Sequence, residues 1–159
     1  KLVKLKKKSN ITIDKKKYKI RVYENLVDGS EHFALIKGRI KTKSAPRVRV
    51  ISSNIVQNYL INQKIPNSFK KTFNYFKKYS NCVLIFIKDT NLKSFLSSTS
   101  KYNSNKKFVR NDNFIRNYGI GAQIIKDLKI KKMILITRSH KRVVGLDGFN
   151  IKITSQEII

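Results

Sequence analysis

Two short apolar runs constrain the fold of this chain more than any other feature of its sequence. Residues 82–87 read CVLIFI, without a single polar side chain, and residues 132–137 read KMILIT. Runs of this length without apolar-polar alternation are typical of strands that are buried on both faces of a sheet. Such strands need a covering layer on either side. The sequence therefore predicts a mixed α/β domain in which both runs are buried, neighbouring strands.

Two amphipathic segments are predicted to supply the covering helices. Residues 68–79 place Phe69, Phe73 and Phe76 on one helical face and four lysines on the remaining surface. Residues 113–129 carry apolar and small side chains at helical spacing along one face. We expect a mixed sheet that is flanked by these helices.

Gly119 and Gly121 in the second segment admit another interpretation, a phosphate-binding loop. The dinucleotide fingerprint requires a third glycine and a strand directly before the loop. Here position 124 is Ile, and the polar segment 101–113 precedes the glycines. We therefore expect both glycines to lie in a helix, where they let a neighbouring element come close.

The rest of the chain divides into further strands, a linker and a loop. Residues 1–17 are interpreted as a basic linker from a preceding domain, residues 18–159 as one domain, and residues 97–107 as a mobile loop. Turn residues 28–32 separate two strands that are expected to pair. The segments that read as additional strands are 18–23, 33–40, 47–52 and 148–154.

The charge of the chain is strongly positive, with 36 Lys and Arg against 9 Asp and Glu, a net +27. Such an excess ordinarily indicates a polyanionic partner. However, the lysines are spread along the whole chain with many Asn and Ile, and all three have A/T-rich codons. No recognition helix, zinc finger or RNA-binding aromatic signature is present in the sequence. We expect nonspecific binding to nucleic acid at low salt, and no specific nucleic-acid partner.

The sequence also bears on the compartment. No run reaches the about 18 apolar residues of a membrane span, so no membrane partner is expected. The single cysteine, Cys82, excludes an internal disulfide and is typical of a reducing compartment. We therefore expect a cytoplasmic protein.

Four stretches, in order along the chain, resemble the GTP cyclohydrolase II domain of riboflavin biosynthesis. They are VDGSEHFALIKG (27–38), VRVIS (48–52), RNYGIGAQIIKDLKIKKMILIT (116–137) and VVGLDGFNIKI (143–153). The resemblance implies the fold of that family and its reaction, which opens the guanine ring of GTP and releases formate and pyrophosphate with a zinc-activated water. In many bacteria this domain follows a 3,4-dihydroxy-2-butanone 4-phosphate synthase domain, and the start KLVKLKKK resembles such a junction. The resemblance thus implies a preceding synthase domain and a homodimer.

The family's zinc ligands are replaced in this sequence. Where the family has V-R-V-H-S-E-C, residues 48–54 carry Ile51, Ser53 and Asn54 in place of His, Glu and Cys. The R-C-D-C-G turn, which supplies the other two cysteines, has no counterpart between residues 56 and 69. The remaining candidates, Cys82, His32 and His140, are not spaced as a zinc site. We therefore expect no zinc and no other cofactor.

The family's general base and its guanine-recognition residue are also replaced. Phe114 stands where the resemblance places the general-base Asp, two residues before the nucleophilic Arg, which is retained as Arg116. A phenyl ring cannot accept a proton, and an arginine without a base or a metal is a poor nucleophile. Asp89 lies one position away from the guanine-reading carboxylate of the family. We expect the ring-opening reaction to be absent.

The positions that are retained belong to the phosphate side of the family's nucleotide site. The resemblance implies nucleotide or phosphate binding by Arg49, Ser52, Thr137 and Arg142, beside the retained nucleophile position Arg116. Guanidinium groups bind phosphate well, although a solvated basic loop is an alternative interpretation of TRSHKR (137–142). We expect weak binding of GTP or another phosphate anion.

Two functions remain open at this point. In the first, the domain is degenerate and is kept as a structural or regulatory part of a riboflavin-biosynthesis protein. In the second, it is a nucleotide- or phosphate-binding enzyme of altered specificity. A nucleic-acid-binding module is a distant third.

Overall fold

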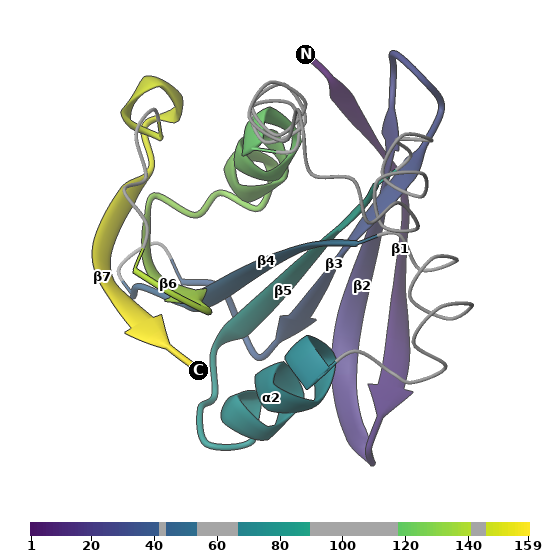
Figure 1. Cartoon of the computed structure of the whole chain (residues 1–159). Helices are drawn as coiled ribbons and strands as arrows, with labels where there is room; N and C mark the ends of the chain where they lie inside the picture. The colour runs from purple at the N-terminus through teal and green to yellow at the C-terminus, as the bar shows by residue number, and fades with distance from the viewer. Residues whose placement is uncertain (42–43, 54–66, 90–117, 141–145) are drawn as a thin grey trace, which may run out of the picture.

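The computed structural model describes residues 1–41, 44–53, 67–89, 118–140 and 146–159. Within them, seven strands form one mixed sheet in the order β1-β2-β3-β5-β4-β6-β7 (Figure 1). The strands β1, β2, β3 and β5 pair antiparallel, whereas β5, β4, β6 and β7 pair parallel. The elements are β1 (Val3–Ile13), β2 (Lys16–Asn25), β3 (Glu31–Lys37), β4 (Arg47–Ser53), α2 (Asn67–Phe76), β5 (Cys82–Lys88), β6 (Lys132–Thr137), the 3-10 turn η1 (Asp147–Phe149) and β7 (Lys152–Ile158).

One helix lies on each face of this sheet (Figure 1). The helix α2 covers one face, and residues 118–127, which are also helical, cover the other. The central strand β5 is buried from Cys82 to Ile87 because its side chains alternate between the two cores. The side chains under residues 118–127 are Val83, Ile85 and Ile87, and those under α2 are Cys82, Leu84 and Phe86. The mixed α/β class and the buried strand are therefore confirmed.

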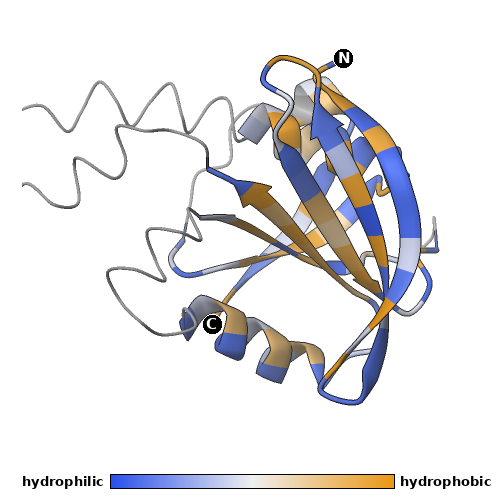
Figure 2. Ribbon diagram, turned by 90° about the vertical axis from the view of Figure 1, so that its right-hand side faces the viewer, coloured by the Kyte–Doolittle hydropathy of each residue, from blue (hydrophilic) through white to orange (hydrophobic). Residues whose placement is uncertain are grey.

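The amphipathic pattern of α2 is confirmed as well. Phe76 is fully buried, and Phe69 and Phe73 pack against the same core. Figure 2 shows the hydrophilic residues of α2 on the side away from the sheet. The end of the helix is closed by Lys37, whose ammonium group donates to the carbonyl oxygens of Phe76 and Tyr79 (2.7 Å for the latter). A cation at this end also interacts favourably with the helix dipole.

Side chains of the second helix attach it to the strands at the beginning of the chain. The Gln123 side-chain oxygen accepts from the backbone N–H of Leu2 (2.6 Å), and Asp127 accepts from the Tyr23 hydroxyl (2.8 Å). Because residues four apart share one helical face, both contacts hold the same face against the sheet. A Cβ at Gly121 would lie 3.5 Å from the Ile87 side chain, so the helix approaches β5 closely. The prediction that the glycines serve helix packing is confirmed.

The interpretation of residues 1–17 as a linker is wrong, because Val3–Ile13 form β1 in the sheet. Ile13 pairs with Lys16 across a two-residue turn in which Asp14 and Lys15 both have positive φ angles (49° and 60°). Such turns are usually marked by Asn-Gly or Asp-Gly, and this one has no glycine. The sequence therefore gave no turn signal. In Figure 2 this outer strand is largely hydrophilic, which obscured it further.

Three other expectations need adjustment. The two apolar runs are both strands, but they are not neighbours, because β4 lies between β5 and β6. The last strand begins at Lys152 and not at residue 148, since η1 comes first. Helical structure is confirmed for residues 118–127 of the expected helix 113–129. Residues 113–117 and the expected loop 97–107 lie outside the described ranges.

Candidate functional site

Three of the five expected site residues lie near the carboxyl end of β6, on that strand or on the neighbouring strand β4. Arg49 and Ser52 belong to β4, and Thr137 is the last residue of β6. Arg49 pairs with Ile136, which directly precedes Thr137. The carboxyl ends of parallel strands are the usual location of ligand sites in α/β sheets. The other two expected residues, Arg116 and Arg142, lie outside the described residues.

The three residues do not share one face of the sheet. Side chains alternate between faces along a strand, and Val48 and Leu135 belong to the core under residues 118–127. Thr137 and Ser52 have the same parity as these residues and therefore face that helix. Arg49 has the opposite parity and faces α2. The structure thus brings the expected residues to one edge, but it places Arg49 on the opposite side from Thr137.

Arg49 is the most unusual side chain at this edge. Only 3% of the residue is exposed, and its Nε and Nη1 atoms have no hydrogen-bond partner in the described part of the chain. Burial, and secondly the positive charge of Arg138, lower the pKa of Arg49 from its usual value. A buried charge without a partner is costly, several kcal/mol in typical proteins. The position therefore favours an anion as the missing partner.

The acidic residue in the same register row is already engaged. Glu157 of β7 pairs with Ile136, and Ile136 pairs with Arg49. The Glu157 carboxylate, however, accepts from the Tyr75 hydroxyl and lies 3.6 Å from the Arg47 guanidinium. Among the described residues, no salt bridge to Arg49 or Arg138 is present.

Thr137 contributes a second buried polar group on the other face. It is 7% exposed, and its hydroxyl has no hydrogen-bond partner among the described residues. Its backbone carbonyl accepts from the N–H of Ile159 (3.0 Å), which fixes the end of β6. Ser52 is exposed on this same side. Hydroxyl groups of this kind can donate to a phosphate oxygen.

The candidate metal ligands do not assemble into a site. His32 is buried, its Nδ1 accepts from the backbone N–H of Lys88 (3.1 Å), and its Nε2 lies 3.2 Å from the Ser30 hydroxyl. Its ring nitrogens are therefore occupied by the protein. His140 is exposed beside Gln156. Across the described ranges, no group of three His, Cys, Asp or Glu residues could hold a metal ion.

Cys82 lies at the wrong end of the sheet to replace a lost ligand. It begins β5 and pairs with Arg47, whereas Ser53 pairs with Lys88 at the other end of the same strand. Six residues of strand separate these ends, about 20 Å at 3.3 Å per residue. Burial raises the pKa of the Cys82 thiol to about 11, against smaller opposite effects of Lys37 and Arg47. A thiol in this state is a core side chain and a poor metal ligand.

The replaced family positions that the structure describes have become part of the scaffold. Ile51 is buried in the core under α2, and Ser53 ends β4 with its carbonyl accepting from the N–H of Asp89 (3.0 Å). Asp89 therefore lies at the same edge as the candidate site. Sequence reasoning treated Arg138 only as part of a basic loop and missed its position beside Arg49. The sequence offered one signal for this position. Arg138 follows Ile136 by two residues, so on an extended strand both side chains point to the same face as Arg49.

No helix in the described part of the chain is long and apolar enough to cross a membrane.

Comparison with known proteins identifies the family. The family model for GTP cyclohydrolase II matches residues 4–157, a range that includes most of β1. The riboflavin biosynthesis protein RibBA of Chlorobium phaeovibrioides is 29% identical over 171 residues, which cover 98% of this chain and 41% of that protein. The monofunctional riboflavin biosynthesis protein RIBA 2, chloroplastic, of Arabidopsis thaliana is 28% identical over 144 residues, and this match covers 30% of that protein.

A solved structure shares the fold. RibBX from A. baumannii, described as a two-domain 3,4-dihydroxy-2-butanone 4-phosphate synthase, matches with a TM-score of 0.63 and 20% identity. The match covers 99% of this chain and 41% of RibBX. The chain thus spans less than half the length of each of these proteins. Since the family match extends over nearly the whole sequence, the chain belongs to the GTP cyclohydrolase II family.

Proposed function

We propose that this chain is a GTP cyclohydrolase II domain of a riboflavin-biosynthesis protein that no longer opens the guanine ring. The observation that carries the proposal is the set of replacements at the metal and base positions, Ile51, Ser53, Asn54 and Phe114. None of these side chains can bind zinc as the family residues do, or accept a proton at neutral pH. The residues present therefore do not fit the family's zinc.

The placement of the other candidate ligands supports this proposal. Cys82 is buried at the amino end of β5, and both ring nitrogens of His32 contact other protein groups. A metal site at the carboxyl edge would therefore need ligands that neither residue can supply. Without a metal-activated water or a base, the retained Arg116 would be a poor nucleophile.

The proposed role is structural or regulatory, beside a preceding synthase domain in a cytoplasmic homodimer. The relatives named RibBA and the two-domain RibBX support the neighbouring synthase domain, because the chain corresponds to only part of each of them. The domain would keep the family scaffold and lose the family reaction. The second candidate, a nucleotide- or phosphate-binding protein of altered specificity, is favoured by the buried guanidinium of Arg49, in which Nε and Nη1 have no hydrogen-bond partner among the described residues.

The test of catalysis is formate release from GTP by the purified protein, measured with and without added zinc. We expect no release above background and no zinc that remains after dialysis. The matched variant is Arg116→Ala, which should behave as the unchanged protein does. Formate release that scales with protein and disappears in Arg116→Ala would refute the proposal, as would about one tightly held zinc per chain.

A further inference from the structure

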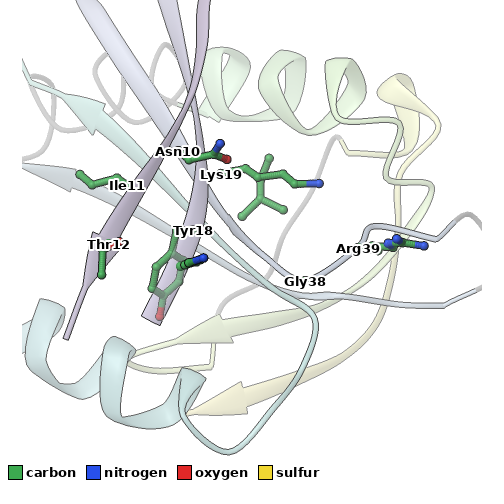
Figure 3. A pocket seen from close by; sticks show the side chains of 9 residues that line it. Asn10, Ile11, Thr12, Tyr18, Lys19, Gly38 and Arg39 are labelled. Atoms are coloured by element: carbon green, nitrogen blue, oxygen red, sulfur yellow. The ribbon is translucent and has the colours of Figure 1, made fainter. Parts of the chain in front are cut away.

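A basic hollow lies at the end of the sheet opposite to the candidate nucleotide site. It has a volume of about 540 Å³ and is formed by β1, β2, the end of β3 and the turn after it (Figure 3). The residues that matter for its chemistry are Asn10, Thr12, Lys17, Lys19, Ile36 and Arg39. Gly38 follows β3, whose Lys37 pairs with Cys82 at the amino end of β5. The candidate nucleotide site lies at the carboxyl ends of the strands, so the two regions are separate.

The strand register gathers the polar side chains on one face. Asn10 pairs with Lys19, Thr12 pairs with Lys17, and Lys19 pairs with Ile36. Directly paired residues point to the same side of a sheet. That side is the face covered by residues 118–127, because Ile36 belongs to their core. Figure 3 shows Lys19 and Tyr18 leaving β2 on opposite sides.

Arg39 is brought to the hollow by a constrained turn. Gly38 has a φ angle of +76°, and a Cβ at this position would lie 2.2 Å from the carbonyl oxygen of Ser80. Only glycine fits such an approach without a shift of the backbone. Arg39 directly follows this turn and lines the hollow.

The cations of the hollow have no acidic partner in the described ranges. The salt bridges there involve Lys6, Arg21, Arg47 and Lys77, and none involves a cation of the hollow. The acidic residue in the adjoining turn, Asp14, lies 3.7 Å from Lys77. The side chains of Lys17, Lys19 and Arg39 thus create a positive potential that no salt bridge of the described residues neutralises.

We propose that this hollow binds a small phosphorylated compound with at least two negative charges. The three cations attract phosphate, the Asn10 amide and the Thr12 hydroxyl can donate to its oxygens, and Ile36 offers an apolar floor for a carbon skeleton. The volume lies within the about 300–1,000 Å³ of small-molecule sites and is too small for a folded partner. This site is independent of the proposed loss of GTP ring opening.

The experiment is a titration of the isotope-labelled protein, followed by the backbone amide signals, with inorganic tripolyphosphate and with fructose 1,6-bisphosphate. We expect the signals of residues 10–12, 17–19 and 38–39 to shift with either compound. Tighter binding of fructose 1,6-bisphosphate would assign the site to phosphorylated metabolites. Tighter binding of tripolyphosphate would assign it to inorganic phosphates. Shifts that are confined to the region of Arg49 and Thr137 would overturn the inference.

Matched variants separate a built site from bulk charge. The variant Lys17→Gln, Lys19→Gln, Arg39→Gln should bind both compounds at least about a hundredfold more weakly, because it loses three charged hydrogen-bond donors and each is worth about a factor of ten or more. The control Lys70→Gln, Lys71→Gln, Lys78→Gln removes the same charge from the exposed surface of α2 and of the turn that follows it, and should change affinity less than about twofold. Equal weakening by both variants would overturn the inference. A 12-nucleotide single strand that binds far more tightly than either compound would also overturn it, in favour of an extended nucleic-acid surface.

Discussion

Arg47 and Arg49 stand two residues apart on β4 and face the same helix, yet their surroundings are opposite. At the amino end of the strand, Arg47 donates to the Tyr75 hydroxyl (2.8 Å), lies 3.6 Å from Glu157 and stacks over the Tyr79 ring at 3.5 Å. Further along, Arg49 is more deeply buried and has no partner for two of its nitrogens in the described part of the chain. The comparison separates an arginine whose partners belong to the fold from one that we propose is available to a ligand.

The pKa shifts of the two residues follow the same division. Burial alone would lower the pKa of Arg47, but the hydrogen bond with Tyr75 and the charge of Glu157 raise it overall. Burial lowers the pKa of Arg49, and Arg138 lowers it further. The described residues therefore stabilise the charge of Arg47 and do not compensate that of Arg49. An anion would restore the balance at the second position only.

The prediction with the largest expected effect concerns the amino ends of β4 and β5. It tests whether water is excluded there, as the contacts of Arg47 indicate. Cys82 pairs with Arg47, and its pKa is raised from 9.0 to about 11 by burial. A raised pKa favours the folded state while the thiol is neutral, so this contribution is present below pH 9 and is lost as the pH rises through about 11. We expect a loss of roughly 3 kcal/mol over that window, measured by urea unfolding. In Cys82→Ala the loss over the same window should be smaller by about this amount, although the tyrosines with raised pKa values, Tyr18, Tyr23 and Tyr75, still contribute to it. A slope equal to that of the unchanged protein would show that water reaches this end.

The next effect concerns stability at neutral pH. Arg47→Met should lower the free energy of unfolding by about 2 kcal/mol, because Tyr75 and Glu157 lose a partner and the stacking on Tyr79 is lost. The matched variant Arg49→Met should leave stability unchanged or raise it by about 1 kcal/mol, since it removes an unpaired buried charge. Urea unfolding of both variants checks the contrast. Equal destabilisation by the two variants would show that Arg49 stabilises the fold as Arg47 does, which would contradict the comparison.

The prediction with the smallest expected effect concerns anion binding, in which we expect Arg49 to matter and Arg47 not to. Pyrophosphate, GTP and ATP should bind weakly, with similar affinities, and less tightly as salt increases. Arg49→Met should weaken this binding about tenfold, because it removes a charged hydrogen-bond donor, whereas Arg47→Met should not change it. Calorimetric titration at two salt concentrations provides the measurement. Tight binding selective for GTP would contradict the proposed loss of guanine recognition.

The sequence predicted the elements whose local pattern agrees with their environment. The run 82–87 is buried on both faces, and the Phe69, Phe73 and Phe76 stripe packs as one face of α2. The order of the strands was not accessible in this way, because the insertion of β4 between β5 and β6 depends on contacts between distant segments. A local sequence pattern contains no information on such contacts.

The candidate site was predictable as a set of residues but not as a geometry. Arg49, Ser52 and Thr137 were identified through the resemblance, and all three lie near one edge of the sheet. Their division between two faces follows only from the register of β4 with β6. The basic hollow was missed for a different reason: its floor includes β1, which the lysine-rich sequence and the glycine-free turn concealed.

The contact between Gln123 and the backbone of Leu2 and Val3 has a consequence for how the chain folds during synthesis. The two sides of this contact are separated by 121 and 120 residues. At roughly 5–20 residues per second, the ribosome needs on the order of 6–24 s to deliver the second side after the first. Throughout that interval, Leu2 and Val3 lack the helix that covers them in the finished domain. Late docking of the helix would make the start of the chain one of the last parts of the protein to become protected from proteases and chaperones.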